Sequence, residues 1–513
     1  MTDTPTPSKP FTPGQLALLT VGLALGTFME VLDTSIANVA VPTIAGNLGV
    51  SANQGTWVIS SYSVAAAIAV PLTGWLARQV GECRLFIMSL IAFTLASIMC
   101  GLAPNMTALV GFRLLQGLVS GPMVPLSQTI LMRSYPLQKR SMAMALWSMT
   151  VVVAPILGPL LGGWITDNIH WSWIFFINVP VGICSALIAM FLLKGRETRI
   201  SRMPIDKIGL ALLVFGVGSL QMMLDLGNDR DWFNSPFILS LALIAAVCLI
   251  YLVIWEWGEA HPVVDLTLFK QRNFAIGVLM LGIGFMTFFC SVVIFPLWLQ
   301  QVMGYTAGEA GLATAPSGLL AVIMAPIIGK NLNRWDPRAV ISVGFTVFAV
   351  VSFWCATFSL DSSFAQVLAP RLLQGVGVAC FFIPLNAITL AGIEENRLAS
   401  ASGLSNFIRT LSGAIGTSLS VTLWDHRATF HHARLGESIT QSAAGTQGYL
   451  TQLQNLGFSS GESNAHLEQL LTAQSYMIAA NDFYYLCGGV FVLLIGLVWL
   501  TRPRRGAAVA MGH

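Results

Sequence analysis

Three charged residues lie inside long apolar segments, where a charge is costly, and they are the residues best able to do chemistry. Glu30 and Asp33 share one apolar segment near the N-terminus, and Arg113 lies in a later one. An ionised side chain at the bilayer centre costs about 2.5–3.5 kcal/mol on insertion scales, so such residues are usually functional. Glu30 and Asp33 are three residues apart and share one helix face, and Arg113 is expected at a similar depth. The spacing predicts a buried ionic cluster.

Such a cluster could couple proton binding to a conformational change. Burial disfavours the charged form of a carboxyl group, and a nearby guanidinium favours it. If Arg113 moves away from Asp33 or Glu30, the carboxylate should bind a proton, and it should lose that proton when the arginine returns. The alternative is a static salt bridge that ties two helices together. The sequence leaves both interpretations open.

A repeated arginine motif indicates two related halves. The segment 113–117, Arg-Leu-Leu-Gln-Gly, recurs at 371–375, and a Pro-Leu pair follows each copy about a dozen residues later. In transporters, matching segments mark two pseudo-equivalent halves around a central site. The second copy supplies Arg371, Gln374 and Gly375. No acidic residue lies at a clearly matching depth in the second half, so Arg371 and Arg409 are expected to be structural.

A segment rich in glycine and proline and a set of adaptable apolar residues are further candidates. Pro155, Gly158, Pro159, Gly162 and Gly163 fall in one predicted helix, where glycine permits close packing and proline permits bending. This segment is either a tight packing face or a hinge between conformations. Methionine and phenylalanine can repack around varied ligands. The candidate residues for a substrate cavity are Met29, Met123, Met149, Phe285, Phe288 and Phe289.

The composition of the chain indicates that these residues belong to a membrane protein. The chain has 513 residues, 55% hydrophobic and only 10% charged, with a mean hydropathy of +0.73. A soluble domain usually has about 25% charged residues, so lipid must be the main solvent. We predict an all-α integral membrane protein with fourteen transmembrane helices. The predicted spans are 15–37, 54–76, 85–103, 107–130, 141–164, 172–193, 207–225, 236–256, 274–301, 308–330, 339–358, 365–390, 399–424 and 482–501.

The basic residues give an orientation. With a cytoplasmic N-terminus, 20 lysines and arginines fall on the cytoplasmic side, and only Arg230, Arg427 and Arg434 fall outside. This bias follows the positive-inside rule and puts both termini in the cytoplasm. The predicted parts are a tail (1–14), an N-terminal six-helix bundle (15–194), two inserted helices (195–262), the first five helices of a C-terminal bundle (263–425), a periplasmic loop (426–481), the last transmembrane helix (482–501) and a tail (502–513).

The long outer segment is polar. Residues 426–481 are too polar for the bilayer, and from Ser463 onward their apolar spacing predicts an amphipathic helix that runs toward the last span.

No GxxxxGK[ST], HExxH or GxSxG motif occurs in the sequence. An enzyme is therefore not expected, and neither is a cofactor. The proton motive force is the expected energy source, although a passive facilitator, an importer of a metabolite or an exporter of one metabolite remains an alternative.

Several motifs together resemble the fourteen-helix drug:proton antiporters of the major facilitator superfamily. They cover almost the whole chain. The segments that carry the resemblance are Leu32–Pro42, Arg113-x-x-Gln116-Gly117, Gly158-Pro159-x-x-Gly162-Gly163, Trp171–Gly182, Pro262–Leu266 and Pro296–Gln301. Leu224-Asp225-x-Gly227, Asp231-Trp232-Phe233 and the long outer segment are similar to the EmrB subgroup of multidrug exporters.

The resemblance implies a fold, a function and partners. It implies two six-helix bundles with two inserted helices, proton transfer at Arg113, an antiporter motif at residues 158–163, and export of hydrophobic, drug-like compounds from a bacterial inner membrane. It also implies a tripartite pump with an EmrA-like periplasmic adaptor and a TolC-like outer-membrane channel. One segment departs from the family pattern. Arg78 stands where an aspartate is usual, and Glu82 and Cys83 stand where basic residues are usual. The charge lock expected of residues 74–84 is therefore in doubt.

Overall fold

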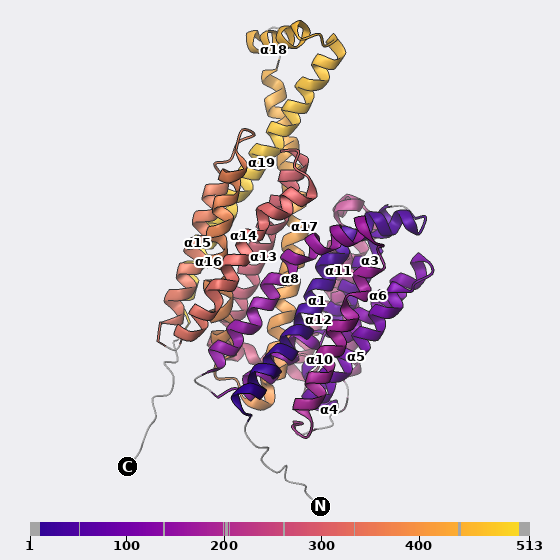
Figure 1. Ribbon diagram of the computed structural model, residues 1–513, viewed down its shortest axis with the longest axis vertical. Helices are drawn as coiled ribbons and strands as arrows, with labels where there is room; N and C mark the ends of the chain where they lie inside the picture. Colours follow the sequence, from indigo (N-terminus) through magenta and orange to yellow (C-terminus); the bar gives the residue numbers. More distant parts are fainter. Residues whose placement is uncertain are drawn as a thin grey trace, which may run out of the picture.

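The computed structural model describes residues 11–50, 52–136, 139–198, 200, 204, 206–259, 262–332, 334–439 and 443–501. Within these residues, helices are the only regular secondary structure. The helices form two bundles. A helical stalk, which lies within residues 426–439 and 443–481, projects from one face of the molecule (Figure 1). Helix α1 begins and helix α19 ends on the opposite face. We call these the stalk face and the terminal face. The predicted tails at 1–14 and 502–513 lie almost wholly outside the described residues.

The N-terminal bundle is built from six spans, three of which are broken. The chain bends by 63° between α3 and α4, where Pro71 removes a backbone donor. A second break, at Gly121-Pro122, lies against the first, since a Cβ on Gly121 would be 2.7 Å from the Ala69 carbonyl carbon. The elements are α1 (Pro13–Asn47), α2 (Ala52–Gly55), α3 (Trp57–Ala69), α4 (Thr73–Val80), α5 (Glu82–Gly101), α6 (Met106–Ser120), α7 (Met123–Ser134), α8 (Arg140–Asn168), α9 (Trp173–Phe176) and α10 (Asn178–Leu193).

The C-terminal bundle repeats the packing of the first. In each half the first span packs against the fifth (α1 on α8, α13 on α17) and the second against the fourth (α3 on α6, α14 on α16). The repeated arginine motif thus lies on corresponding helices. The elements are α13 (Arg272–Gln301), α14 (Ala307–Asn331), α15 (Pro337–Cys355), α16 (Phe364–Leu390), η5 (Glu395–Arg397), α17 (Leu398–Ser438), α18 (Ala444–Asn455) and α19 (Ser460–Val498).

Two inserted helices connect the bundles. Helices α11 (Lys207–Leu226) and α12 (Pro236–Gly258) pack on each other, and α11 also packs on α3. On the stalk face, Trp232 Nε1 donates to Thr422 Oγ1 at 2.8 Å, and Ser418 Oγ donates to the Leu224 carbonyl at 2.7 Å. Three short 3-10 helices complete the insert and its exit: η2 (Asn228–Arg230), η3 (Trp232–Asn234) and η4 (Leu266–Lys270). The insert is therefore attached to both halves.

Each of the fourteen predicted spans coincides with a helix or a pair of consecutive helices. Within the part of the chain that the structure describes, 11 helical segments are long and apolar enough to cross a membrane, or 12 if the bent pair α3–α4 counts as one span. The remaining two predicted spans correspond to α8 and α17, which are 29 and 41 residues long. Helix α17 contains more polar residues than the other spans. Ser402, Ser405 and Asn406 are among them, and they are buried against other helices instead of facing lipid.

The expected periplasmic loop at 426–481 is instead mostly helical. Helix α17 continues to Ser438, α18 covers Ala444–Asn455, and α19 begins at Ser460 and runs into the last span without a break. The structure therefore contains the helix predicted from Ser463 onward, and the segment predicted as a loop is mostly helical; its position in the periplasm stays a prediction. Polar residues of α17 and α19 contact each other in this segment: His431 Nε2 lies 2.8 Å from Asp482 Oδ2, and His432 Nε2 lies 2.9 Å from Glu468 Oε1.

Candidate functional site

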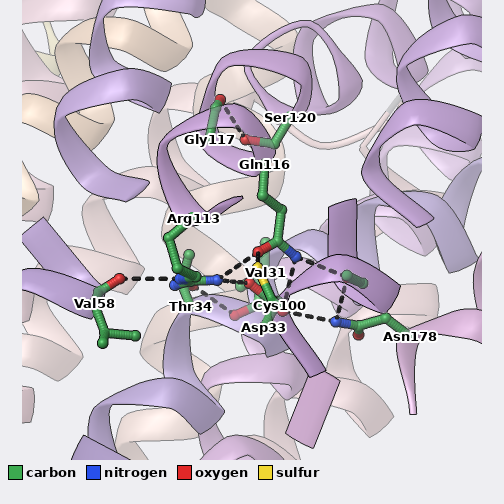
Figure 2. A network of polar contacts seen from close by, with 11 residues as sticks. Val31, Asp33, Thr34, Val58, Cys100, Arg113, Gln116, Gly117, Ser120 and Asn178 are labelled. Carbon is green, nitrogen blue, oxygen red and sulfur yellow. Dashed lines mark hydrogen bonds and ion pairs between the residues drawn. The ribbon is translucent and has the colours of Figure 1, made fainter. Parts of the chain in front are cut away.

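Asp33 and Arg113 form a fully buried ion pair between α1 and α6. Arg113 Nη1 lies 2.5 Å from Asp33 Oδ2, and both residues have 0% exposure (Figure 2). Charges buried this completely are stable only when they are paired and hydrogen-bonded. The structure thus brings together the two residues that spacing and depth had placed in one cluster.

The second oxygen of Asp33 is also fully used. Asn178 Nδ2 of α10 donates to Oδ1 at 2.6 Å, and Gln116 Nε2 donates to the same oxygen at 3.2 Å. Both amides also donate to Ser97 Oγ of α5, at 3.2 Å and 2.7 Å. Sequence reasoning did not single out Asn178 or Ser97 as site residues. Asn178 lies within one of the family motifs, so its polar side chain in an apolar segment was the available signal.

Arg113 is held by more than its carboxylate partner. Its Nε donates to the Val58 carbonyl at 3.0 Å, and Nη1 also donates to Gln116 Oε1 at 2.8 Å. The guanidinium lies 4.3 Å from the centre of the Tyr62 ring, a cation–π geometry. Removing Asp33 as a partner would leave these contacts in place. The pair therefore joins α1 to a rigid support made of α3, α5, α6 and α10.

Glu30 does not join this network. It has 9% exposure, and among the described residues its Oε2 has no hydrogen-bond partner, while the ion pair that the structure describes for Arg113 is with Asp33. Glu30 interacts electrostatically both with Asp33 and with Arg409 of α17, in the other bundle. The expectation of a three-residue cluster is therefore only partly met. Helical spacing put Glu30 and Asp33 on one face, but one turn of displacement is enough to give Glu30 a different neighbour.

The second copy of the motif contains no carboxylate partner in the described structure. Arg371 Nη1 donates to Gln374 Oε1 at 2.5 Å, Nη2 donates to Tyr484 Oη at 3.3 Å, and the guanidinium lies 3.4 Å from the Phe295 ring centre. A Cβ on Gly375 would fall 2.9 Å from the Ala321 backbone nitrogen, so this glycine permits close packing. The second half thus keeps the arginine and glutamine but not the acid.

The glycine-rich segment packs α8 closely against α1, next to Asp33. A Cβ on Gly158 would lie 2.5 Å from Ser35 Cβ, and one on Gly162 would lie 2.9 Å from the Ile36 carbonyl oxygen. Ser35 Oγ donates to the Pro155 carbonyl at 3.0 Å. A Cβ on Gly163 would meet no atom of the described residues within 4 Å. The side chain of Pro159 lies outside the described part of the structure.

The six candidate cavity residues divide into three groups. Met29 faces α10, since a Cβ on Gly182 would lie 3.2 Å from its sulfur, and Met123 is fully buried in the core. Met149 packs with residues of α14 and α16, between the bundles. Phe285, Phe288 and Phe289 form one ring cluster, with Phe288 5.7 Å from Phe348 inside the C-terminal bundle. Met149 is thus the candidate with contacts to the other bundle.

Polar contacts between the bundles gather on the terminal face. Arg133 Nη2 pairs with Glu82 Oε1 at 3.1 Å and also donates to the Glu395 carbonyl across the bundle interface. Arg78 Nη2 donates to Ser400 Oγ at 3.0 Å. Deeper in the interface, Gln128 Oε1 accepts a hydrogen bond from Asn406 Nδ2 at 3.0 Å. The divergent loop at 74–84 therefore takes part in a lock between the bundles: Arg78 contacts Ser400 directly, and Glu82 pairs with Arg133, which reaches Glu395.

Breaking this lock should favour opening of the terminal face. Arg133→Gln removes the hydrogen bond to the Glu395 carbonyl across the interface, and a hydrogen bond of this kind contributes about 1 kcal/mol. We expect roughly a fivefold rise in the labelling rate of a cysteine placed at the buried Ser402, in a cysteine-free chain, by a water-soluble thiol reagent. Arg84→Gln is the matched control, because Arg84 contacts Glu197 of its own bundle. Equal labelling rates in the two variants would rule out the lock.

Comparison with known proteins identifies the family. A model of the Major Facilitator Superfamily matches residues 23–417. The chain is 50% identical to the multidrug export protein EmrB of Escherichia coli (strain K12), over 97% of this chain and 98% of that protein. It is 49% identical to the fatty acid resistance protein FarB of Neisseria gonorrhoeae, over 95% and 96% of the two chains.

Solved structures share the fold at much lower identity. The human organic anion transporter MFSD10 aligns with a TM-score of 0.60 and 13% identity, over 95% of this chain and 100% of that chain. The proton:xylose symporter XylE aligns with a TM-score of 0.58 and 15% identity, over 95% and 96%. The chain belongs to the major facilitator superfamily, and it is therefore a multi-pass membrane transporter and not an enzyme. Within that superfamily its sequence is EmrB-like across nearly its whole length.

Proposed function

We propose that this chain is a proton-driven exporter of hydrophobic, drug-like compounds, located in a bacterial inner membrane with both termini in the cytoplasm. The observation that carries the proposal is the buried pair of Asp33 and Arg113, with both carboxylate oxygens bonded. If α1 and α6 separate, Asp33 loses its cation and binds a proton, and reforming the pair expels it. The names of the EmrB and FarB relatives support export of drugs and of fatty acids as the substrate range.

The energetics suit this coupling. A membrane potential of 100 mV supplies about 2.3 kcal/mol for each proton that enters. One proton could then sustain roughly a fiftyfold gradient of an uncharged substrate. The two bundles pivot about a central site in transporters of this kind. The terminal face, which is closed in this structure by Arg133 and Glu395, is the cytoplasmic face under this proposal.

Reconstitution into proteoliposomes tests the function. With an imposed pH gradient, a proton-driven exporter moves a fluorescent hydrophobic cation such as ethidium against its gradient, and proton flux rises when the substrate is added. A passive facilitator gives the same substrate distribution with and without the pH gradient. An exporter of one metabolite moves none of a panel of unrelated hydrophobic dyes. Either of these results would overturn the proposal.

The helical stalk is the part we propose to contact an EmrA-like periplasmic adaptor, which in turn would meet a TolC-like channel. The stalk extends beyond both bundles (Figure 1) and carries exposed apolar residues near its tip. Leu456 is 70% exposed, and Phe458 is 37% exposed. Exposed apolar groups of this kind mark contact surfaces.

Removing the tip of the stalk should abolish adaptor binding without unfolding the transporter. The segment 439–459 can be replaced by a short Gly-Ser linker, because α17 and α19 lie side by side there and are joined by the His432–Glu468 contact. We expect unchanged thermal unfolding, since the tip makes few contacts with the bundles, and loss of co-purification with the adaptor. A matched substitution of Leu456 and Phe458 by serine should weaken co-purification. Full retention of the complex in the shortened chain would contradict this role.

A further inference from the structure

Asn178 contacts Asp33 from a different helix than Arg113 does, and Asp33 lies between the two side chains (Figure 2). Asn178 is at the start of α10, directly after the turn that follows α9, and it is 1% exposed. A buried amide is costly unless it is hydrogen-bonded. Its Nδ2 donates to Asp33 Oδ1 at 2.6 Å and to Ser97 Oγ at 3.2 Å. The amide is therefore held in place by α1 and α5 together.

The chemistry of the carboxylate determines which way this amide points. An ionised carboxylate accepts hydrogen bonds and cannot donate them, so the Asn178 atom next to Asp33 Oδ1 must carry hydrogen. Gln116 is oriented in the same sense, since its Oε1 accepts from Arg113 Nη1 at 2.8 Å and its Nε2 donates to Asp33 Oδ1. Oδ1 thus receives N–H groups from two amides. Hydrogen bonds to a charged form favour that form, so both amides stabilise the ionised carboxylate.

The two amides differ in the helix that carries them. Gln116 lies on α6, one turn after Arg113, and is hydrogen-bonded to it, so these two side chains move together. Asn178 lies on α10, which packs directly against α1, whereas α6 packs on α3 and α5. If α6 moves away from α1, Asp33 loses Arg113 and Gln116 and keeps Asn178. Asn178 is then the donor that contacts the carboxylate while it exchanges its proton.

The other groups around Asp33 cannot take over this task. The titratable and charged groups that interact with Asp33 among the described residues are Arg113 on α6, Glu30 on α1 itself, Tyr62 on α3 and Cys100 on α5. Helix α8 presents glycine and a backbone carbonyl to α1 near Asp33. Arg113 is the cation of this set. Once it has left, the N–H of Asn178 is the group that still favours the ionised form.

We propose that Asn178 is a positioning residue for proton transfer, which stays bonded to Asp33 after Arg113 has left and sets the pH at which the carboxylate exchanges its proton. The inference rests on the proton-driven export proposed above and adds a residue to its proton site. A donor that favours the carboxylate lowers the proton affinity of Asp33, so the proton leaves again when Arg113 returns. Without this donor, Asp33 keeps its proton to a higher pH and the ion pair re-forms less readily.

The pH dependence of export in proteoliposomes tests this role. The pH is raised in steps on both sides of the membrane, with the difference between the sides kept constant, and the initial rate of ethidium export is recorded. Export declines once the pH is too high for Asp33 to bind a proton, and the midpoint of this decline is compared between variants. Asn178→Leu, which has a similar size and no donor, should raise the midpoint by at least about one pH unit, a tenfold gain in proton affinity. Asn178→Ser, a smaller side chain that serves if leucine prevents folding, should shift the midpoint in the same direction.

Ser185 provides a matched control on the same pair of helices. It is fully buried on α10, and its Oγ donates to the Gly22 carbonyl of α1 at 2.7 Å. Ser185→Ala removes a contact between α10 and α1 and leaves Asn178 in place, so the midpoint should stay at the wild-type pH even if the rate falls. The role of Asn178 is overturned if Asn178→Leu keeps or lowers the wild-type midpoint. It is also overturned if Ser185→Ala raises the midpoint equally, which indicates a packing role.

The same experiment separates this role from the proposed function. Wild-type export that does not respond to the imposed pH gradient would overturn proton-driven export, and the role of Asn178 with it. Coupled export by the wild type, with an unchanged midpoint in Asn178→Leu and Asn178→Ser, would overturn the role of Asn178 alone.

Discussion

Asp33→Asn is expected to reduce proton-driven export by about a hundredfold, the usual effect of removing a group that must accept a proton. Asparagine fits the same space and keeps hydrogen bonds with Asn178 and Gln116, but its amide cannot bind a proton near neutral pH. The rate of ethidium accumulation in proteoliposomes with an imposed pH gradient measures the effect. Wild-type export by this variant would remove Asp33 from the mechanism.

A stability control separates coupling from a static salt bridge. Asp33→Asn leaves Arg113 buried without a counterion, and breaking a buried pair in this way costs about 3–5 kcal/mol. The double variant Asp33→Asn with Arg113→Gln removes the unpaired charge, so it should recover much of the lost thermal stability. It should not recover export. If the double variant exports normally, the pair serves only to hold α1 against α6.

The glycines of α8 give the second large effect. Gly158→Val should destabilise the protein by about 1–3 kcal/mol through overpacking and should lower export at least about tenfold. The reason is that a Cβ at position 158 would lie 2.5 Å from Ser35 Cβ, and Ser35 follows Asp33 by two residues on α1. Displacing α1 therefore displaces the carboxylate from Arg113. Thermal unfolding and export rate, measured on the same preparation, report the two consequences.

Gly163 provides a control within the same motif. A Cβ there meets no atom of the described part of the chain within 4 Å, so Gly163→Ala should leave export unchanged and slightly stabilise the helix, because alanine favours helix by about 1 kcal/mol over glycine. Gly162→Ala should behave like Gly158→Val in milder form. If Gly163→Ala and Gly158→Val have equal effects, the glycines act through helix flexibility and not through close contact with α1.

Spacing and depth were enough to predict the pairing of Asp33 with Arg113. A charged residue in a long apolar segment has few possible partners, and those at the same depth are fewer still. The same reasoning failed for Glu30, because depth does not determine which neighbouring helix a side chain faces. Asn178 and Ser97 were missed since uncharged polar residues are common in apolar segments, and only contacts across helices distinguish them.

The outer segment shows where composition misleads. Residues 426–481 are polar, and polarity excluded them from the bilayer, yet α17 and α19 continue as helices beyond the spans. A helix outside the membrane needs only a partner surface, which the helices α17 and α19 provide for each other through pairs such as His431 with Asp482. Likewise, Met29 was a reasonable cavity candidate by type, but its direction toward Gly182 depends on how α1 packs on α10.

Proton release by the purified transporter is the most direct test of the coupling role of Asp33. A pH-sensitive dye in weakly buffered detergent solution records protons released when a substrate such as ethidium is added. We expect release of up to one proton per transporter by the wild type and none by Asp33→Asn, with substrate binding retained in both. Equal proton release by the two proteins would contradict it.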